Sequence, residues 1–391
     1  MNNKINKILN VPTLRFPNYS GEWQVSSLEN VCTFYKGYGI SKENLSNDGT
    51  PCILYGELYT TYKTAMAKII KSKTNLNPAL LFHSRKNDVI IPCSGETAED
   101  IATSVCIPYD DILLGGDLTV IRSCLDGAFL SNQINSVRKH DIARIAQGKS
   151  IVHLQVDELK KISISYPHIA EQKKISWFID KIDERIEVQN KIISKYETLI
   201  KGIRHHVFGS ICGEKQSSLG NFLEEYSEKN VANNLQSVAV GKYGIRKRED
   251  IYSKELSTDY FKNKVIRKNT LIIGMGSTQI DIGILTTDDC YCVSPAYTTY
   301  RIKGVNSFYL QEYLIELNPL LSVRYMITSA RQGKAVNKED LMKHLMTIHS
   351  ENEQKEICRC FENLYSRLQI EKEMLSALQK QKAFLLQSMF I

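Results

Sequence analysis

Apolar residues recur at alternating spacings of three and four residues in two long stretches of the chain. One stretch follows Glu171-Gln172-Lys173-Lys174-Ile175, and the other follows Glu353-Gln354-Lys355-Glu356-Ile357, at an offset of 182 residues. Such an alternation is typical of a coiled-coil seam. The seam positions are Ile179, Ile182, Ile186, Gln189, Ile193, Tyr196, Ile200, Ile203, Phe361, Leu364, Leu368, Glu371, Leu375, Leu378 and Leu385. We therefore expect two long helices that pair with each other as an antiparallel coiled coil.

Two of these seam positions are polar. In a fully overlapped antiparallel pair, in which the numbers of facing residues sum to about 564, Gln189 lies near Leu375 and Glu371 lies near Ile193. Polar groups in neighbouring layers cost stability, but they also penalise slipped registers. We expect them to specify how the two helices align.

The rest of the chain also repeats. Short apolar runs between turn-forming residues predict strands at residues 51–56, 88–92 and 118–122, and helices are predicted at 27–31 and 129–146. Residues 87–97 correspond to 269–279, again at an offset of 182. The sequence predicts a mixed α+β fold, in which two similar α/β domains alternate with the two helices as a pseudo-two-fold internal repeat. The expected boundaries are residues 1–150 (with an extended arm at 1–23), 151–210, 211–335 and 336–391.

Composition is that of an ordinary soluble protein. Of the 391 residues, 42% are hydrophobic and 24% are charged, and no run approaches the roughly 20 apolar residues that span a bilayer. The ten cysteines include no Cys-x-x-Cys pair, which favours reduced thiols in a cytoplasmic protein over a zinc site. The formal net charge of +7 permits a polyanionic partner but does not establish one.

Catalytic motifs are missing from the sequence. Gly274-Met-Gly-Ser277 lacks the third glycine of a dinucleotide fingerprint, and no phosphate loop, nucleophile elbow or His-Glu-x-x-His motif occurs. The Asn-Pro-Pro-aromatic tetrad of amino-methyltransferases is also missing. We expect a chain that does no chemistry itself and binds no metal or cofactor.

Tyrosines cluster with basic, amide and hydroxyl side chains in both domains. Lys and Arg neutralise phosphates, and Arg, Gln, Ser and Thr can read base edges, although such clusters also occur on protein-binding surfaces. The candidate DNA-binding residues are Lys36, Tyr38, Tyr59, Tyr62, Lys63, Ser94, Glu96 and Thr97 in the first domain, and Lys242, Tyr243, Arg246, Lys247, Arg248, Ser277, Thr278 and Gln279 in the second.

These features together resemble the specificity subunit of type I restriction–modification systems. Pro12-x-Leu-Arg-Phe-Pro17 followed by Gly21-Glu-Trp23 resembles the N-terminal arm of that family. The stretch from Pro167 through Glu171-Gln172 to Phe208 resembles its central conserved region, and Glu353-Gln354 to Phe390 resembles its distal one. In the second copy Ser350 or a neighbour replaces the proline. The resemblance covers essentially the whole chain, while the variable regions match only in plan.

The resemblance implies two target recognition domains, each reading one half of a bipartite asymmetric site in double-stranded DNA. The paired helices would space these domains and dock two methyltransferase subunits, which bind S-adenosylmethionine and methylate adenine. Restriction subunits would add ATP- and Mg-dependent translocation and cleavage. A helix of about 36 residues spans about 54 Å, so we expect an insertion in either helix to change the spacer between the half-sites. The alternatives from other classes are a scaffold whose duplicated heads bind proteins and, disfavoured by the missing motifs, a self-contained enzyme.

Overall fold

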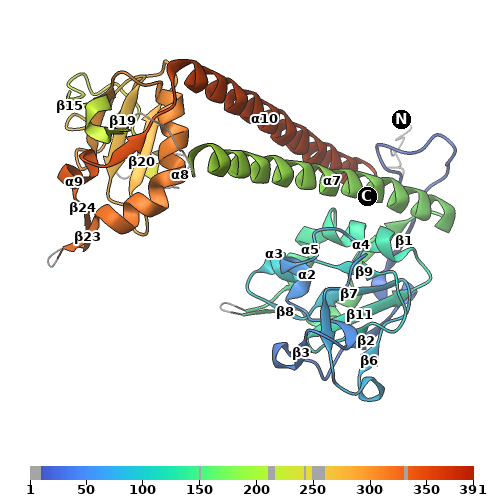
Figure 1. Ribbon diagram of the computed structural model, residues 1–391. Helices are drawn as coiled ribbons and strands as arrows, with labels where there is room; N and C mark the ends of the chain where they lie inside the picture. Colours follow the sequence, from blue (N-terminus) through green and yellow to red (C-terminus); the bar gives the residue numbers. More distant parts are fainter. Residues whose placement is uncertain (1–9, 149–150, 210–215, 242–243, 249–259, 330–332) are drawn as a thin grey trace, which may run out of the picture. The chain divides into compact units, whose positions relative to one another are not determined.

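The computed structural model describes residues 10–148, 151–209, 216–241, 244–248, 260–329 and 333–391 (Figure 1). By its internal contacts the chain divides into two compact units. Unit 1 comprises residues up to 191 together with residues 373–391, and unit 2 comprises residues 192–372. The long helices α7 (Ile169–Phe208) and α10 (Glu351–Ser388) therefore each contribute to both units.

Unit 1 is built on an antiparallel sheet in the order β2-β11-β7-β9. Its strands are β2 (Cys32–Lys36), β11 (Leu118–Ser123), β7 (Asp88–Pro92) and β9 (Val105–Ile107). Successive residues of a strand face opposite sides of the sheet. Accordingly Val89 and Ile91 join one core cluster while Ile90 joins another, and β7 is buried along its whole length. The strands predicted at 88–92 and 118–122 are confirmed.

A second sheet of unit 1 has the order β3-β5-β4-β10-β6, and two further strand pairs are β1–β13 and β12–β8. These strands are β1 (Gln24–Ser27), β3 (Leu45–Ser46), β4 (Thr50–Ile53), β5 (Ser72–Thr74), β6 (Phe82–His83), β8 (Ser94–Gly95), β10 (Leu113–Leu114), β12 (Val152–His153) and β13 (Ser163–Tyr166). The short helical elements are α1 (Leu28–Val31), η1 (Lys42–Asn44), α2 (Glu57–Thr60), η2 (Pro78–Leu80), α3 (Ala98–Ile101) and α6 (Val156–Lys160).

The single helix predicted over residues 129–146 is wrong in its middle. The structure has two helices there, α4 (Gly127–Asn135) and α5 (Lys139–Ile145). At the break, Ser136 has φ −117° and ψ −94°, and its hydroxyl donates to the Asn132 carbonyl at 2.6 Å. The amide of Asn135 donates to the Ser104 carbonyl at 2.8 Å. These polar side chains offer the backbone an alternative to helical bonding, which ends α4.

Unit 2 is built on an antiparallel sheet in the order β15-β22-β19-β20. Its strands are β15 (Leu223–Tyr226), β22 (Thr298–Ile302), β19 (Thr270–Gly274) and β20 (Asp281–Leu285). Beside it lie two strand pairs, β16 (Val238–Gly241) with β17 (Gly244–Lys247), and β18 (Lys264–Ile266) with β21 (Tyr291–Val293). A parallel bridge from Ser237 to Cys292 joins these pairs.

The remaining elements of unit 2 complete the same plan. They are β14 (Gln216–Ser218) paired with β25 (Leu345–Thr347), β23 (Met326–Ser329) paired with β24 (Gly333–Val336), η3 (Leu219–Phe222), α8 (Ser307–Tyr325) and α9 (Lys338–Met342). The order β15-β22-β19-β20 repeats β2-β11-β7-β9, and β17-β16-β21-β18 repeats β5-β4-β10-β6. Asn87 and Asn269, which precede β7 and β19, both have positive φ, 78° and 64°. The predicted pair of similar mixed α/β domains is confirmed.

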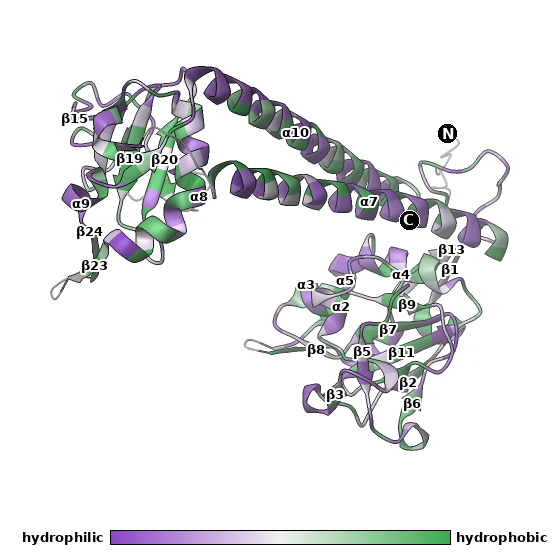
Figure 2. Ribbon diagram, viewed as in Figure 1, coloured by the Kyte–Doolittle hydropathy of each residue, from purple (hydrophilic) through white to green (hydrophobic). Residues whose placement is uncertain are grey.

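In both units α7 and α10 pack against each other in antiparallel directions. Their hydrophobic and hydrophilic residues alternate in bands along each helix (Figure 2). In unit 1 Ile179 packs in one cluster with Leu385, and Asp183 forms an ion pair with Lys382 at 2.5 Å, close to the expected register. In unit 2 the stacked rings of Phe208 and Phe361 lie about one turn away from that register. Each predicted seam residue is buried or half-buried.

The glutamine of each repeated Glu-Gln pair attaches a long helix to its unit by the same two hydrogen bonds. Gln172 accepts from the Asp126 backbone N–H at 2.9 Å and donates to the Pro167 carbonyl at 2.8 Å. Gln354 accepts from the Asn306 N–H at 3.2 Å and donates to the His349 carbonyl at 2.9 Å. Asp126 and Asn306 are the N-cap residues of α4 and α8, so the long helix is bonded to the helix that covers the sheet.

The extended arm of unit 1 binds the start of α7 and the end of α10. Arg15 forms a two-pronged ion pair with Glu171 at 2.7 and 2.8 Å, and the Glu171 side chain is 2% exposed. The Leu14 N–H donates to the Ser388 carbonyl at 2.9 Å, while Trp23 is buried against Phe129. The arm therefore ties the two helix ends of unit 1 together.

Candidate functional site

Predicted binding residues of unit 1 gather at one end of its central sheet. Lys36 ends β2 opposite Thr119, and Pro92 ends β7 opposite Leu118. Leu118 and Thr119 are the first two residues of β11. Residues 36–38 and 94–97 therefore leave the sheet at the same end. The hydrogen bonds of Gln172 lie at the opposite end, since Asp126 follows the last residues of β11. The candidate residues are thus kept clear of the helix attachment.

The connection between β4 and β5 adds aromatic and basic side chains to this end. Burial raises the pKa of the Tyr59 hydroxyl, and the neighbouring Tyr55, Asp100 and Glu96 raise it further. Lys63 is exposed and its ammonium donates to the Tyr59 carbonyl at 3.3 Å. The structure therefore brings Tyr59 and Lys63 close to the loop of Glu96.

Two of the predicted residues of unit 1 lie beneath the surface. Tyr62 is 8% exposed and packs in the core cluster of Ile90 and Val105, so its ring has no free face. Ser94 is 7% exposed and its hydroxyl hydrogen-bonds to Nδ1 of His153 at 3.2 Å. Lys36, Tyr38, Glu96 and Thr97 are exposed, although the Thr97 hydroxyl also caps α3. Fewer residues of unit 1 are therefore exposed for DNA binding than the sequence predicted.

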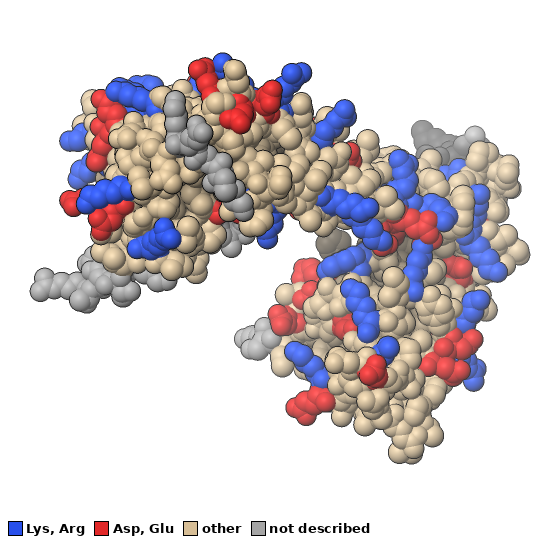
Figure 3. Space-filling view, viewed as in Figure 1, with Lys and Arg blue, Asp and Glu red and all other residues tan. Residues whose placement is uncertain are grey.

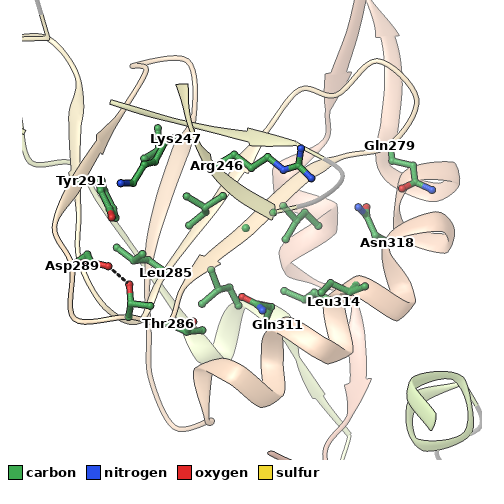
Figure 4. Close-up of a pocket in the computed structure, with 18 residues that line it drawn as sticks. Arg246, Lys247, Gln279, Leu285, Thr286, Asp289, Tyr291, Gln311, Leu314 and Asn318 are labelled. Carbon is green, nitrogen blue, oxygen red and sulfur yellow. Dashed lines mark hydrogen bonds between the residues drawn. The ribbon is translucent and has the colours of Figure 1, made fainter. Parts of the chain in front are cut away.

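In unit 2 a hollow of about 560 Å³ runs along the edge strand β20. Arg246 and Lys247 of β17, Gln279 of the β19–β20 turn and Gln311 of α8 contribute its polar lining (Figure 4). Ile282, Ile284, Leu285, Leu314 and Ile315 are among its apolar lining residues. The hollow combines hydrogen-bond donors and acceptors with an apolar floor.

The other predicted residues of unit 2 lie around this hollow or outside the described residues. Ser277 and Thr278 are exposed in the same turn as Gln279, and Arg248 is half-buried directly after β17. Lys242 and Tyr243 lie outside the described residues. The hairpin β16–β17 and the turn 275–280 therefore supply the predicted residues of unit 2 that the structure describes.

These two clusters occupy matching places in the repeated fold. β16–β17 corresponds to β4–β5, and the turn 275–280 follows β19 as residues 93–97 follow β7. The connection differs greatly in length, however, being residues 54–71 in unit 1 and only residues 242–243 in unit 2. In unit 1 the longer connection bonds to the free edge of β9, where the Cys106 N–H donates to the Ala65 carbonyl at 2.8 Å. The matching edge in unit 2, β20, borders the hollow.

Comparison with known proteins relates part of this chain to a family and its whole fold to solved structures. Residues 20–198 match the family model described as type I restriction modification DNA specificity domain. This match relates residues 20–198 of the chain to the type I restriction–modification specificity domain. Its fold matches the crystal structure of a type I restriction–modification S subunit from M. genitalium with a TM-score of 0.61 and 16% identity, over 97% of this chain and 99% of that one. A chain from a structure on complex assembly and conformational transition of the type I R-M system matches with a TM-score of 0.57 and 16% identity, over 93% and 96%.

Charge is mixed on the surface of this chain. On the face shown in Figure 3, lysines and arginines are interspersed with acidic residues and form no single continuous patch. Several cations are paired with acids, as Arg267 is with Glu228 at 2.5 and 2.7 Å. Among the described residues no group of histidine, cysteine and acidic side chains could hold a metal ion, and none of their helices has the length and apolarity to cross a membrane.

Reasoning from the sequence missed residues that only the folded chain brings together. Gln311 lines the hollow from α8, and no local pattern distinguishes it from other helical glutamines. The guanidinium of Arg122 lies 4.8 Å from the ring centre of Tyr35, and that of Arg301 lies 5.3 Å from Tyr226. Arg122 and Arg301 stand on the matching strands β11 and β22, but their tyrosine partners lie on the neighbouring strands β2 and β15.

Proposed function

We propose that this chain is the non-catalytic specificity subunit of a type I restriction–modification complex, and that each unit reads one half of a bipartite asymmetric DNA site. The observation that carries the proposal is that the two units share one strand order and one mode of helix attachment but differ in their loops. The sheet orders and the glutamine attachments repeat, whereas the exposed loop chemistry does not. A duplicated frame suits two half-sites on opposite strands, and unlike loops suit unlike sequences.

The long helices are proposed to dock two methyltransferase subunits. Trp177, Val188 and Leu199 are exposed on α7 and follow one another at intervals of about three turns, so they share one helix face. On α10, Ile370, Met374 and Phe384 are exposed. Exposed apolar side chains on helices suit partner helices. S-adenosylmethionine, ATP and Mg would then be bound by the methyltransferase and restriction subunits in the cytoplasm rather than by this chain.

The test is single-molecule sequencing of methylated adenine in hosts with and without this chain, with the methyltransferase subunit present in both. A two-part motif that appears only when the chain is present is the expected result, and it gives both half-sites directly. An unchanged methylation pattern with a demonstrably active methyltransferase subunit would refute the proposal.

A scaffold whose two units bind proteins is the second candidate, and the interspersed charges favour it. The dependence of binding on salt separates the two functions. Binding to phosphates weakens steeply with salt because neutralised phosphates release counterions. The specificity role therefore predicts a DNA affinity that falls by orders of magnitude between low and moderate salt, whereas a protein scaffold has no such DNA affinity.

A further inference from the structure

One side of the hairpin β16–β17 carries small residues beside Arg246. Cross-strand partners share a side of an antiparallel pair, so Ala239 lies beside Arg246, and Gly241 beside Gly244. A side chain on Gly244 would meet no atom within 4 Å. Val240 and Ile245 share the other side and pack on the core of unit 2. A two-stranded ribbon with small residues outward can approach the major groove closely.

Polar side chains able to read bases stand beside this ribbon. In Figure 4 Arg246 extends toward the side on which Gln279 and Asn318 lie. The Asn318 amide donates to the Ile280 carbonyl at 2.9 Å and accepts from the Ser322 hydroxyl, which holds the turn of Gln279 against α8. Arginine pairs with guanine and glutamine with adenine through two hydrogen bonds each.

The matching connection in unit 1 offers different chemistry. Leu58, Tyr62 and Ala67 anchor it in the core, which leaves Thr60 and Lys63 exposed. The exposed carboxylate close to it belongs to Glu96, and a carboxylate accepts from the amino group of cytosine. The same place in the frame therefore presents a carboxylate beside a lysine and a threonine in unit 1, and an arginine and a glutamine in unit 2.

We propose that this place, formed by the β4–β5 connection with Glu96 in unit 1 and by the β16–β17 hairpin with Gln279 in unit 2, reads the bases and makes the two half-sites differ. The inference rests on the proposed function and extends it to particular residues. Glu96 selects a cytosine in one half-site, while Arg246 selects a guanine and Gln279 an adenine in the other. Because the connection is longer in unit 1, the two units present different DNA-contacting surfaces on sheets of the same strand order.

The experiment uses the complex of this chain with its methyltransferase subunits and duplexes in which each base pair of the bipartite site is changed in turn. The variants are Glu96→Ala, Arg246→Ala and Gln279→Ala. Lys86 and Lys268 stand at matching positions before β7 and β19, at the other end of each sheet. Lys268→Ala is therefore the control for the cation lost in Arg246→Ala, and Lys86→Ala is the control for removing a charged side chain of unit 1 away from these loops. Dissociation constants are compared at one salt concentration.

In the unaltered complex each wrong base pair should weaken binding by about 5- to 150-fold. Gln279→Ala should remove that penalty at one A·T pair of one half-site, and Glu96→Ala at one G·C pair of the other. The inference is overturned if all penalties stay unchanged, or if the control variants remove them equally. A failure of the proposed function looks different, because the unaltered complex would then show no base preference at any position.

Discussion

Replacing either attachment glutamine by leucine should loosen one unit and spare the other. In Gln172→Leu the N–H of Asp126 and the carbonyl of Pro167 lose their partner at a site where Gln172 is 2% exposed. An unpaired buried backbone group costs about 1–3 kcal/mol, so two cost about 2–6 kcal/mol. Gln354→Leu removes the equivalent pair in unit 2. Because whole domains are stable by about 5–15 kcal/mol, each loss is measurable.

Hydrogen exchange read by mass spectrometry locates the effect. In Gln172→Leu, peptides covering α4 and the start of α7 should exchange faster, while α8 and the start of α10 keep their protection. Gln354→Leu should give the reverse pattern. Gln379→Leu, at an exposed position of α10, is the control for adding a leucine. Equal acceleration in both units, or none in either, would refute the idea that each glutamine attaches its own unit.

Three further outcomes test other parts of the structure. Arg15→Ala should destabilise unit 1 by about 3–5 kcal/mol in urea unfolding, because Glu171 is left buried and unpaired; Arg15→Lys should recover part of the loss, and an unchanged midpoint would contradict the pairing. Replacing Gln189 and Glu371 together by leucine should stabilise the pair of helices by on the order of 1 kcal/mol and so raise the melting temperature, and a lower melting temperature would refute the idea that these polar side chains cost stability in the seam. Burial and then the charge of Arg324 lower the pKa of His344, so the unfolded state binds the proton more tightly and unit 2 should lose stability as pH falls below about 6.5. His344→Gln should flatten that pH dependence of the melting temperature, and an identical slope in both proteins would exclude this histidine as its source.

The long helices and the strands β7 and β11 could be predicted because their signals are local. The two helices, and β7 with β19, repeat at an offset of 182 residues, and a seam or a buried strand is recognised from the spacing of its own apolar residues. The break between α4 and α5 escaped because it depends on Asn135 and Ser136 finding backbone partners, one of them on a distant segment. The repeated glutamines were visible in the sequence, but their role required the N-cap residues that they bond.

The repeat of the second sheet was hidden by the very segment that distinguishes the units. The strands β4 and β5 are joined by residues 54–71, whereas β16 and β17 are joined by residues 242–243. This difference in length changes the offset between matching strands, so β5 and β17 do not match at the offset of the rest of the repeat. Tyr62 was predicted as a binding residue because nothing in its neighbouring sequence indicates that it is buried. In the structure it anchors the long β4–β5 connection in the core. Under the proposed function, a unit that keeps its glutamine attachment to the long helix while one connection changes length would recognise different bases and still be attached in the same way. The glutamines recur because two backbone groups must be paired in each unit, whereas the backbone bonds between the β4–β5 connection and β9 belong to unit 1.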